Sequence, residues 1–132
     1  MAVEGLVTVK SAFGPEETMQ RLETEVKAKG MTVFAHVDHA AGAAAVGLPL
    51  RPTNLLIFGA AKGGTPLMQI NQIAGIDLPL KILLWEDADG ASHVSYVDPA
   101  WIAELRGLGP EGAAAAAKLQ ALLAGLASEA AA

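Results

Sequence analysis

The sequence predicts a two-layer α+β domain, in which a five-stranded, mostly antiparallel sheet carries helices on one face. Two patterns support this prediction. Short apolar runs of strand length alternate with segments of helical periodicity, and Asp89-Gly90 between two apolar runs marks a hairpin. The chain has 132 residues, of which 52% are hydrophobic and 17% charged, so it can bury a core and is not globally disordered. We expect one domain over residues 1–127 and a frayed tail over residues 128–132.

The first third of the chain predicts a strand, a helix and a second strand. Residues 3–10 alternate between inward and outward positions of a half-buried strand. Pro15 suits the first position of a helix, where its missing N–H costs nothing, and Gly30 suits a left-handed cap at the end of that helix. Residues 31–38 form the second strand. Simple alternation would place Met31, Val33, Ala35 and Val37 on one face and Thr32, Phe34, His36 and Asp38 on the other.

The middle of the chain predicts one interior strand between less regular segments. Residues 39–46 are small and alanine-rich and fit a short helical turn. Residues 53–58 are apolar on both sides, which predicts a strand covered on both faces. Residues 59–64 predict a glycine-rich loop, followed by a short helix with Thr65 as its cap and Pro66 as its first residue.

The last third predicts a hairpin followed by two helices. The hairpin strands cover residues 81–86 and 92–97. Asp98-Pro99 begins a short helix that Gly107 ends, and Gly109-Pro110 begins the last helix. The apolar stripe of that last helix would be Ala115, Leu119, Leu122 and Leu126.

The second face of the sheet is expected to be apolar without a covering helix. Monomers rarely expose apolar patches of more than a few hundred Å². We therefore expect this face to be a homodimer interface or the wall of a ligand cavity. It would carry Leu6, Phe34, His36, one of Leu56 and Ile57, and one of Ile82 and Leu83.

Composition excludes several classes of function. A net charge of −5 argues against a protein that binds nucleic acid through its phosphates. The absence of cysteine excludes disulfides, thiol catalysis and zinc sites built on thiolates. No window approaches about 18 strongly apolar residues, and no apolar segment follows a basic start, so we expect a soluble, cytoplasmic protein without membrane association.

Several ordered strings of residues carry a family resemblance. They cover residues 38–44, 48–59, 64–69 and 74–81, and residues 85–87 and 96–99 also fit. From about Gly5 to about Gly107 the chain resembles the domain of unknown function family DUF302. The resemblance implies a fold similar to that of the TATA-binding protein, in the order β-α-β4-α. It implies no established activity, and the fold by itself does not imply DNA binding.

Asp38 and His39, at the end of the second strand, are the first candidate site residues. With His36 they supply two imidazoles and a carboxylate, which can act as general acid and base, contact a ligand or bind a metal. Their spacing matches no metal motif, so we predict no metal site. The more common structural alternative is that Asp38 caps the next helical turn and His39 bonds to the backbone.

A second group of candidates follows the glycine-rich segment. Lys62 and Thr65 lie where a strand leads into a helix N-terminus, which can hold an anion, although the pattern of a nucleotide-binding loop is missing. The alternative is a tight connection whose glycines supply positive φ angles. Met68 and Asn71 combine an apolar wall with an amide that could orient a small ligand, and Met68 with His39 could also ligate haem iron. Packing of Met68 is the structural alternative.

These observations favour a homodimeric module that binds or senses a small molecule. One alternative is an enzyme of unknown reaction that uses His39 as base with Asp38 in the same cleft. Another is a structural or interaction domain that uses its apolar sheet face. Catalytic residues and cofactors are not identifiable from the sequence. The candidate ligand-binding residues are Asp38, His39, Lys62, Thr65, Met68 and Asn71.

Overall fold

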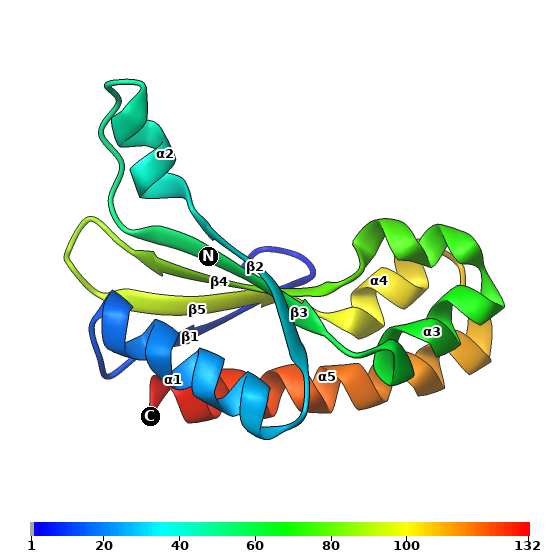
Figure 1. Cartoon of the computed structure of the whole chain (residues 1–132). Helices are drawn as coiled ribbons and strands as arrows, with labels where there is room; N and C mark the ends of the chain where they lie inside the picture. The colour runs from blue at the N-terminus through cyan, green and yellow to red at the C-terminus, as the bar shows by residue number, and fades with distance from the viewer. Residues whose placement is uncertain (1) are drawn as a thin grey trace.

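The computed structural model describes residues 2–132 and contains one antiparallel sheet with the strand order β1-β5-β4-β3-β2 (Figure 1). This confirms the predicted two-layer α+β architecture, and β1 and β2 form the two edges of the sheet. The strands are β1 (Leu6–Lys10), β2 (Thr32–Asp38), β3 (Thr53–Gly59), β4 (Leu80–Glu86) and β5 (Ser92–Val97). The helices are α1 (Pro15–Ala28), α2 (His39–Ala45), α3 (Ala61–Ile70), the 3-10 helix η1 (Gln72–Asp77), α4 (Pro99–Leu105) and α5 (Gly109–Ala131).

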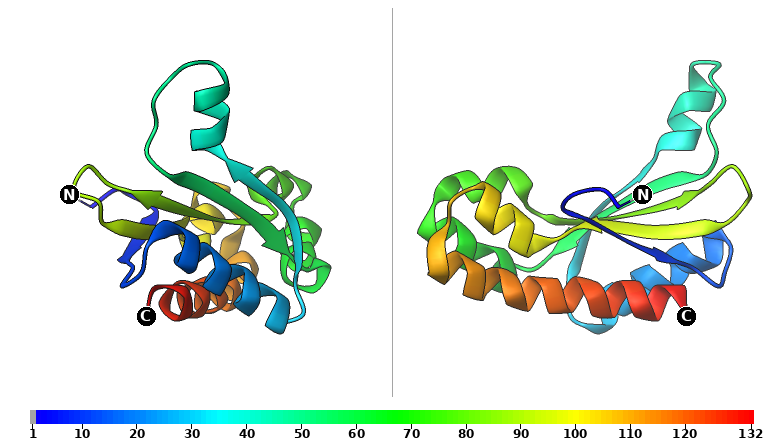
Figure 2. Two further views of the ribbon diagram at one scale, coloured as in Figure 1. Left: turned by 60° about the vertical axis from the view of Figure 1, so that its left-hand side comes forward. Right: turned by 180° about the vertical axis from the view of Figure 1, so that it is seen from behind.

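Helices α1 and α5 lie side by side under one face of the sheet (Figures 1 and 2). As predicted, α1 begins at Pro15, and Gly30 follows it with a φ of +76°. The core between these helices and the sheet is aliphatic and aromatic, and burial of such side chains is the main favourable term in folding. Its largest fully buried members are Leu22, Val26, Leu56, Phe58, Ile82, Leu84, Val94, Leu123 and Leu126.

The buried stripe of α5 differs from the predicted one. Ala116 and Leu123 are buried, whereas the predicted Ala115 and Leu122 are only half-buried. The helix is apolar over most of its circumference, so its composition does not define a single stripe. Packing against both the sheet and α3 selects the residues that are buried.

The end of α5 is also more ordered than the predicted frayed tail. The helix continues through Ala131, which is buried, and the Ala12 N–H donates to the Ala131 carbonyl at 2.8 Å. The Arg21 guanidinium donates to the carbonyls of Glu129 and Ala132, at 3.0 Å each. These bonds satisfy carbonyls that a helix end otherwise leaves to water.

A β-bulge in β2 changes which side chains share a face. The pairing with β3 shifts between Val33 and Ala35, so Phe34 is the extra residue. One extra residue moves every later side chain to the opposite face. His36 therefore pairs with the core residue Leu56 on the helix side. The prediction that Ala35 and Val37 share a face with Val33 is wrong for this reason.

The open sheet face is the side of the sheet opposite α1 and α5. Strand β3 lies in the interior of the sheet, but it is covered on one face only, because Leu55 and Ile57 on the open side are half-buried. The prediction of two-sided cover is therefore wrong. His36, Leu56 and Ile82 do not belong to this face, because they lie on the helix side. Phe34 lies at one end of the open side, where a Cβ on Gly59 would meet its ring at 3.9 Å. The open sheet face is formed by Leu6, Thr8, Ala35, Val37, Thr53, Leu55, Ile57, Lys81, Leu83, Trp85, His93, Ser95 and Val97.

Helix α2 and the loop after it stand away from the sheet (Figures 1 and 2). We call residues 39–52 the arm. The Asp38 carboxylate accepts a hydrogen bond from the Ala41 N–H at 2.9 Å, as the capping interpretation of the sequence predicts. The arm rises on the side opposite α1 and α5, so it borders the open sheet face.

The β4-β5 hairpin forms at the predicted turn, and Asp87 organises it. One Asp87 carboxylate oxygen accepts from the N–H groups of Asp89 and Ala91 at 2.9 and 3.0 Å. The other lies 2.7 Å from Nε2 of His93, whose ring stacks on Trp85. The hydrogen bond from His93, followed by those from the backbone, lowers the pKa of Asp87.

Replacing Asp87 with asparagine is expected to lower the melting temperature at pH 7 and to have less effect in acid. A carboxylate whose folded-state pKa is lowered contributes stability above its unfolded pKa of about 4 and loses it as the pH falls through the folded value. Melting curves of wild type and Asp87→Asn between pH 7 and pH 2.5 measure this. A difference in melting temperature between the two proteins that stays constant from pH 7 to pH 2.5 would contradict the role of the ionised carboxylate.

Candidate functional site

Helix α3 begins five residues before the predicted first residue, Pro66. Its first residue is Ala61, and Thr65 and Pro66 lie inside it. The prediction rested on the preference of proline for the first turn of a helix. Here residues 61–64 are already helical, so the glycine-rich segment is the start of the helix rather than a loop.

The glycines of this segment serve close packing. Gly59, Gly63 and Gly64 all lack positive φ angles, which rules out the alternative in which they supply left-handed turns. A Cβ on Gly63 would lie 3.1 Å from Leu119 of α5, and one on Gly64 would lie 3.3 Å from Leu78. The absence of side chains therefore lets α3 approach α5 and the segment before β4.

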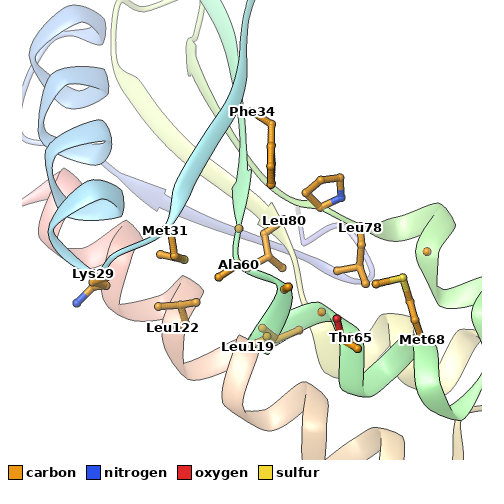
Figure 3. Close-up of a pocket in the computed structure, with 16 residues that line it drawn as sticks. Lys29, Met31, Phe34, Ala60, Thr65, Met68, Leu78, Leu80, Leu119 and Leu122 are labelled. Carbon is orange, nitrogen blue, oxygen red and sulfur yellow. The ribbon is translucent and has the colours of Figure 1, made fainter.

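A cavity of about 440 Å³ lies where α3 meets α5 and the ends of β2 and β3 (Figure 3). We call it the Phe34 pocket. The bulge lies at this end of the sheet, and a Cβ on Gly59 would lie 3.9 Å from both the Phe34 ring and Pro79. Its size falls within the range of about 300–1,000 Å³ typical of small-molecule sites. The lining includes Met31, Phe34, Gly59, Ala60, Gly64, Thr65, Met68, Leu78, Pro79, Leu80, Leu119 and Leu122.

The wall of the Phe34 pocket is almost entirely apolar. Lys29 and Thr65 carry its polar side chains, at separate places on the wall (Figure 3). The Lys29 ammonium points away from the cavity and lies 3.8 Å from Glu129. Among the described residues lining this pocket, none is a histidine or a carboxylate. The pocket is therefore suited to holding an apolar molecule, and it lacks the usual general acids and bases.

The structure separates the predicted site residues into two groups. Asp38 lies opposite Asn54 in the β2-β3 register, whereas the other end of that ladder pairs Thr32 with Gly59, next to α3. Asp38 and His39 are therefore at the far end of the hairpin from the Phe34 pocket. His39 and Met68 cannot ligate one haem iron in this arrangement.

Two of the remaining four candidates contribute to the pocket. Thr65 and Met68 line it, while Lys62 lies on the same helix without lining it. The Asn71 carboxamide oxygen accepts from the Ile73 N–H at 3.1 Å and caps η1. These contacts give Asn71 a structural role next to the pocket.

Asp38 and His36 border a different, more polar concavity of about 560 Å³. His36 Nε2 lies 3.0 Å from Oδ1 of Asn54, and its Nδ1 lies 3.4 Å from Glu23 of α1. Three or more histidine, aspartate or glutamate side chains placed to hold a metal ion do not occur within residues 2–132. Four of the residues that line the concavity are acidic, and two of these, Glu23 and Asp38, have local partners in His36 and the Ala41 N–H.

A smaller cavity of about 270 Å³ adjoins the Phe34 pocket and shares Leu78, Leu80 and Leu119 with it. Asp77 and Arg106 at its edge form a two-point ion pair with distances of 2.7 and 3.1 Å. The Asp77 carboxylate raises the pKa of Arg106. This pair joins η1 to α4, so Asp77 is occupied by a structural contact.

Most of the pocket wall was not among the sequence candidates. Met31, Leu78 and Leu122 come from three separate segments, and each looks like an ordinary core residue in the sequence. Phe34 was expected only as part of the uncovered sheet face, as a dimer interface or a cavity wall. The one available signal was the pair of adjacent glycines before Thr65, which marks a close approach of backbones as well as a turn.

Three comparisons place these features among known proteins. The family model described as "Domain of unknown function DUF302" matches residues 7–126. A crystal structure of an uncharacterized conserved DUF302 protein from Bacillus stearothermophilus has a TM-score of 0.88 and 21% sequence identity, and the match covers 97% of this chain and 99% of that one. That likeness concerns the fold.

Curated relatives carry a functional name. The chain is 48% identical over 105 residues to "Fluoride-specific ion channel FluC 1" of Brucella suis biovar 1, and the match covers 80% of this chain and 41% of that protein. The protein of the same name from Brucella abortus biovar 1 is equally similar, with 39% of its length covered. The chain thus spans about two fifths of the length of these relatives. Over residues 2–132, every helix is too short or too polar to cross a bilayer.

Proposed function

We propose that this chain, which belongs to the DUF302 family, is a module that binds a small, predominantly apolar molecule. The family name gives no activity, so the proposal is drawn from the pocket itself. The observation that carries this proposal is the Phe34 pocket, a cavity of about 440 Å³ with an apolar wall at the junction of β2, β3, α3 and α5. Binding is favoured over catalysis because the wall lacks a histidine or carboxylate among its described residues.

The apolar wall also supports a ligand class. Each methylene moved from water into such a wall contributes about 0.8 kcal/mol, or about fourfold in Kd. Met31 and Met68 have flexible side chains that adapt to ligand shape, and Phe34 offers a ring face for stacking. Thr65 supplies one hydroxyl that orients a polar substituent. The ligand is therefore a small hydrocarbon or aromatic compound with few polar groups.

Filling the pocket should abolish this binding. Ala60 is exposed and lines the pocket, so Ala60→Trp is expected to weaken binding of the neutral fluorophore 1-aminoanthracene by at least about tenfold. Ala88→Trp adds the same side chain at the exposed hairpin tip and should bind like wild type. Fluorescence titration measures both Kd values. Equal binding by the two variants, or no binding by wild type, would overturn the proposal.

Native mass spectrometry of freshly purified, untagged protein complements the titration. Extra mass on the chain would identify a ligand that the protein carries from the cell. An enzyme built on Asp38 and His39 has less support, because the Asp38 carboxylate caps α2 and these residues lie away from the pocket.

We also propose that the module acts as a homodimer. The support is the open sheet face, where Leu6 and Val97 are exposed and Leu55, Ile57 and Leu83 are only half-buried. A cytoplasmic location remains a prediction from the sequence.

A second function is favoured by the 48% identity to the curated fluoride channels. We propose that this chain modulates a fluoride channel, as the matching stretch of those relatives would do within one polypeptide. Deleting the chain in its host should then change the fluoride concentration that halves growth, without changing the response to chloride. An unchanged fluoride response would contradict this second proposal.

A further inference from the structure

The arm is internally ordered but exposed. Asp38 caps α2, and the Leu48 N–H donates to the Ala43 carbonyl at 2.9 Å, which closes the arm on itself. Yet α2 has no buried residue, and the side chains of Val46 and Leu48 are 72% and 62% exposed. An ordered segment that presents large apolar side chains to water has the character of a contact surface.

An apolar row on the open sheet face begins beside the base of the arm. Val37 pairs with Leu55, and Leu55 pairs with Leu83, so the row crosses β2, β3 and β4. Strand β2 ends at Asp38, directly before the arm, and the arm rises on this side of the sheet (Figures 1 and 2). The arm and the row together form one continuous apolar surface, which is stepped because the arm stands above the plane of the sheet.

The solvent-exposed area of the chain indicates how large an interface would cover its excess exposed surface. A compact monomer of 13.5 kDa is expected to expose about 6,500 Å². The described chain exposes 7514 Å², which is about 1,000 Å² more. A stable protein interface buries about 800 Å² on each partner. The excess is therefore of the size that one such interface removes from water.

We infer that the arm of one copy of this chain packs on the open sheet face of a second copy, and that the second arm does the same in return. Two copies of a stepped surface fit together about a twofold axis when the raised arm of each copy lies against the sheet face of the other. Each arm-to-face contact then occurs twice. This inference rests on the homodimer proposed above and specifies its contacts: Leu48 of each arm covers the Val37–Leu55–Leu83 row of the other copy.

Two charge variants test the two sides of this contact. Leu48→Glu on the arm and Val37→Lys on the sheet face should each raise the Kd for dimerisation by at least about 100-fold, because each buries an unpaired charge. Ile76→Glu is the matched control, since Ile76 is 75% exposed on η1, away from both surfaces. Native mass spectrometry over a concentration series gives the dimer fraction, and circular dichroism checks folding.

Mixing the two variants distinguishes this pairing from other dimers. A mixed dimer contains two arm-to-face contacts. In one, the unaltered arm of the Val37→Lys copy packs on the unaltered sheet face of the Leu48→Glu copy. In the other, the introduced carboxylate on the arm lies opposite the introduced ammonium on the sheet face. We expect mixed dimers at concentrations where each variant alone is monomeric. A contact between two sheet faces would leave Leu48→Glu dimeric, and a contact between two arms would leave Val37→Lys dimeric.

The outcomes separate this inference from the proposals on which it rests. A wild-type dimer that survives either variant, or variants that fail to recover on mixing, would overturn the arm-to-face contact and leave the homodimer standing. A monomeric wild type would overturn both. Binding of 1-aminoanthracene, measured on the same samples, tests the ligand proposal separately, because the Phe34 pocket lies at the far end of the β2-β3 hairpin from the arm.

Discussion

Replacing Phe58 with alanine is expected to lower the free energy of unfolding by about 3–5 kcal/mol. Phe58 is fully buried on β3 between the sheet and the helix layer. Truncation removes its apolar contacts and leaves a cavity that the rigid sheet cannot close. Since domains of this size are stable by only about 5–15 kcal/mol, much of the stability would be lost. Urea unfolding followed by circular dichroism measures the change.

The neighbouring residue Ile57 provides the matched control. It is half-buried on the open sheet face, so Ile57→Ala should cost less than Phe58→Ala at protein concentrations low enough for a monomer. If a second copy covers that face, the cost of Ile57→Ala should rise with protein concentration. Equal losses at every concentration would contradict the one-sided cover of the sheet.

Replacing Gly5 with alanine should have the second largest effect, about 2–5 kcal/mol in total. Gly5 has a φ of +76°, and a Cβ there would overlap the Trp101 ring. The strained backbone contributes about 1–2 kcal/mol, and displacing the indole about 1–3 kcal/mol more. The loss is measured by the same urea titration, and a shift in Trp101 fluorescence should accompany it.

Gly30 separates these two contributions. Its φ is also +76°, but a Cβ there would meet nothing within 4 Å. Gly30→Ala should therefore cost only the backbone part, about 1–2 kcal/mol. If the two variants lose the same stability, the close packing of Trp101 on Gly5 contributes nothing.

Much of the fold follows from local chemistry that is visible in the sequence. Pro15 and Asp98 begin helices where predicted, and Asp87 to Gly90 forms the predicted turn. These signals work because each depends on one or two residues and the adjacent backbone. The antiparallel sheet with one helix-covered face follows from the order of such elements.

The features that escaped prediction depend on contacts between distant segments. Nothing in the run Val33-Phe34-Ala35 marks a bulge, yet that single insertion moves His36 to the helix side of the sheet. The first turn of α3 likewise packs closely on Leu119, which lies more than fifty residues later and would be 3.1 Å from a Cβ on Gly63.

The candidate site was only partly predictable for the same reason. Thr65 and Met68 were candidates and do line the Phe34 pocket, whereas Asp38 and His39 lie at the other end of the hairpin. Sequence reasoning favours polar residues as site markers, and this pocket has an apolar wall. Its location is determined by how tightly α3 packs on α5, which is a property of the assembled fold.

The strand order also sets the sequence in which the sheet can be completed. Strands β2 to β5 pair with their neighbours along the chain, but β1 pairs with β5, and the bonded residues Thr8 and Ser95 are 87 positions apart. Closing so long a loop carries an entropy cost, and such contacts slow folding. During synthesis, β1 is made before the other four strands of this sheet, yet its partner β5 is the last of them to be made. Until β5 has emerged, both edges of β1 remain open to pairing with other chains, so this strand is where folding and aggregation compete.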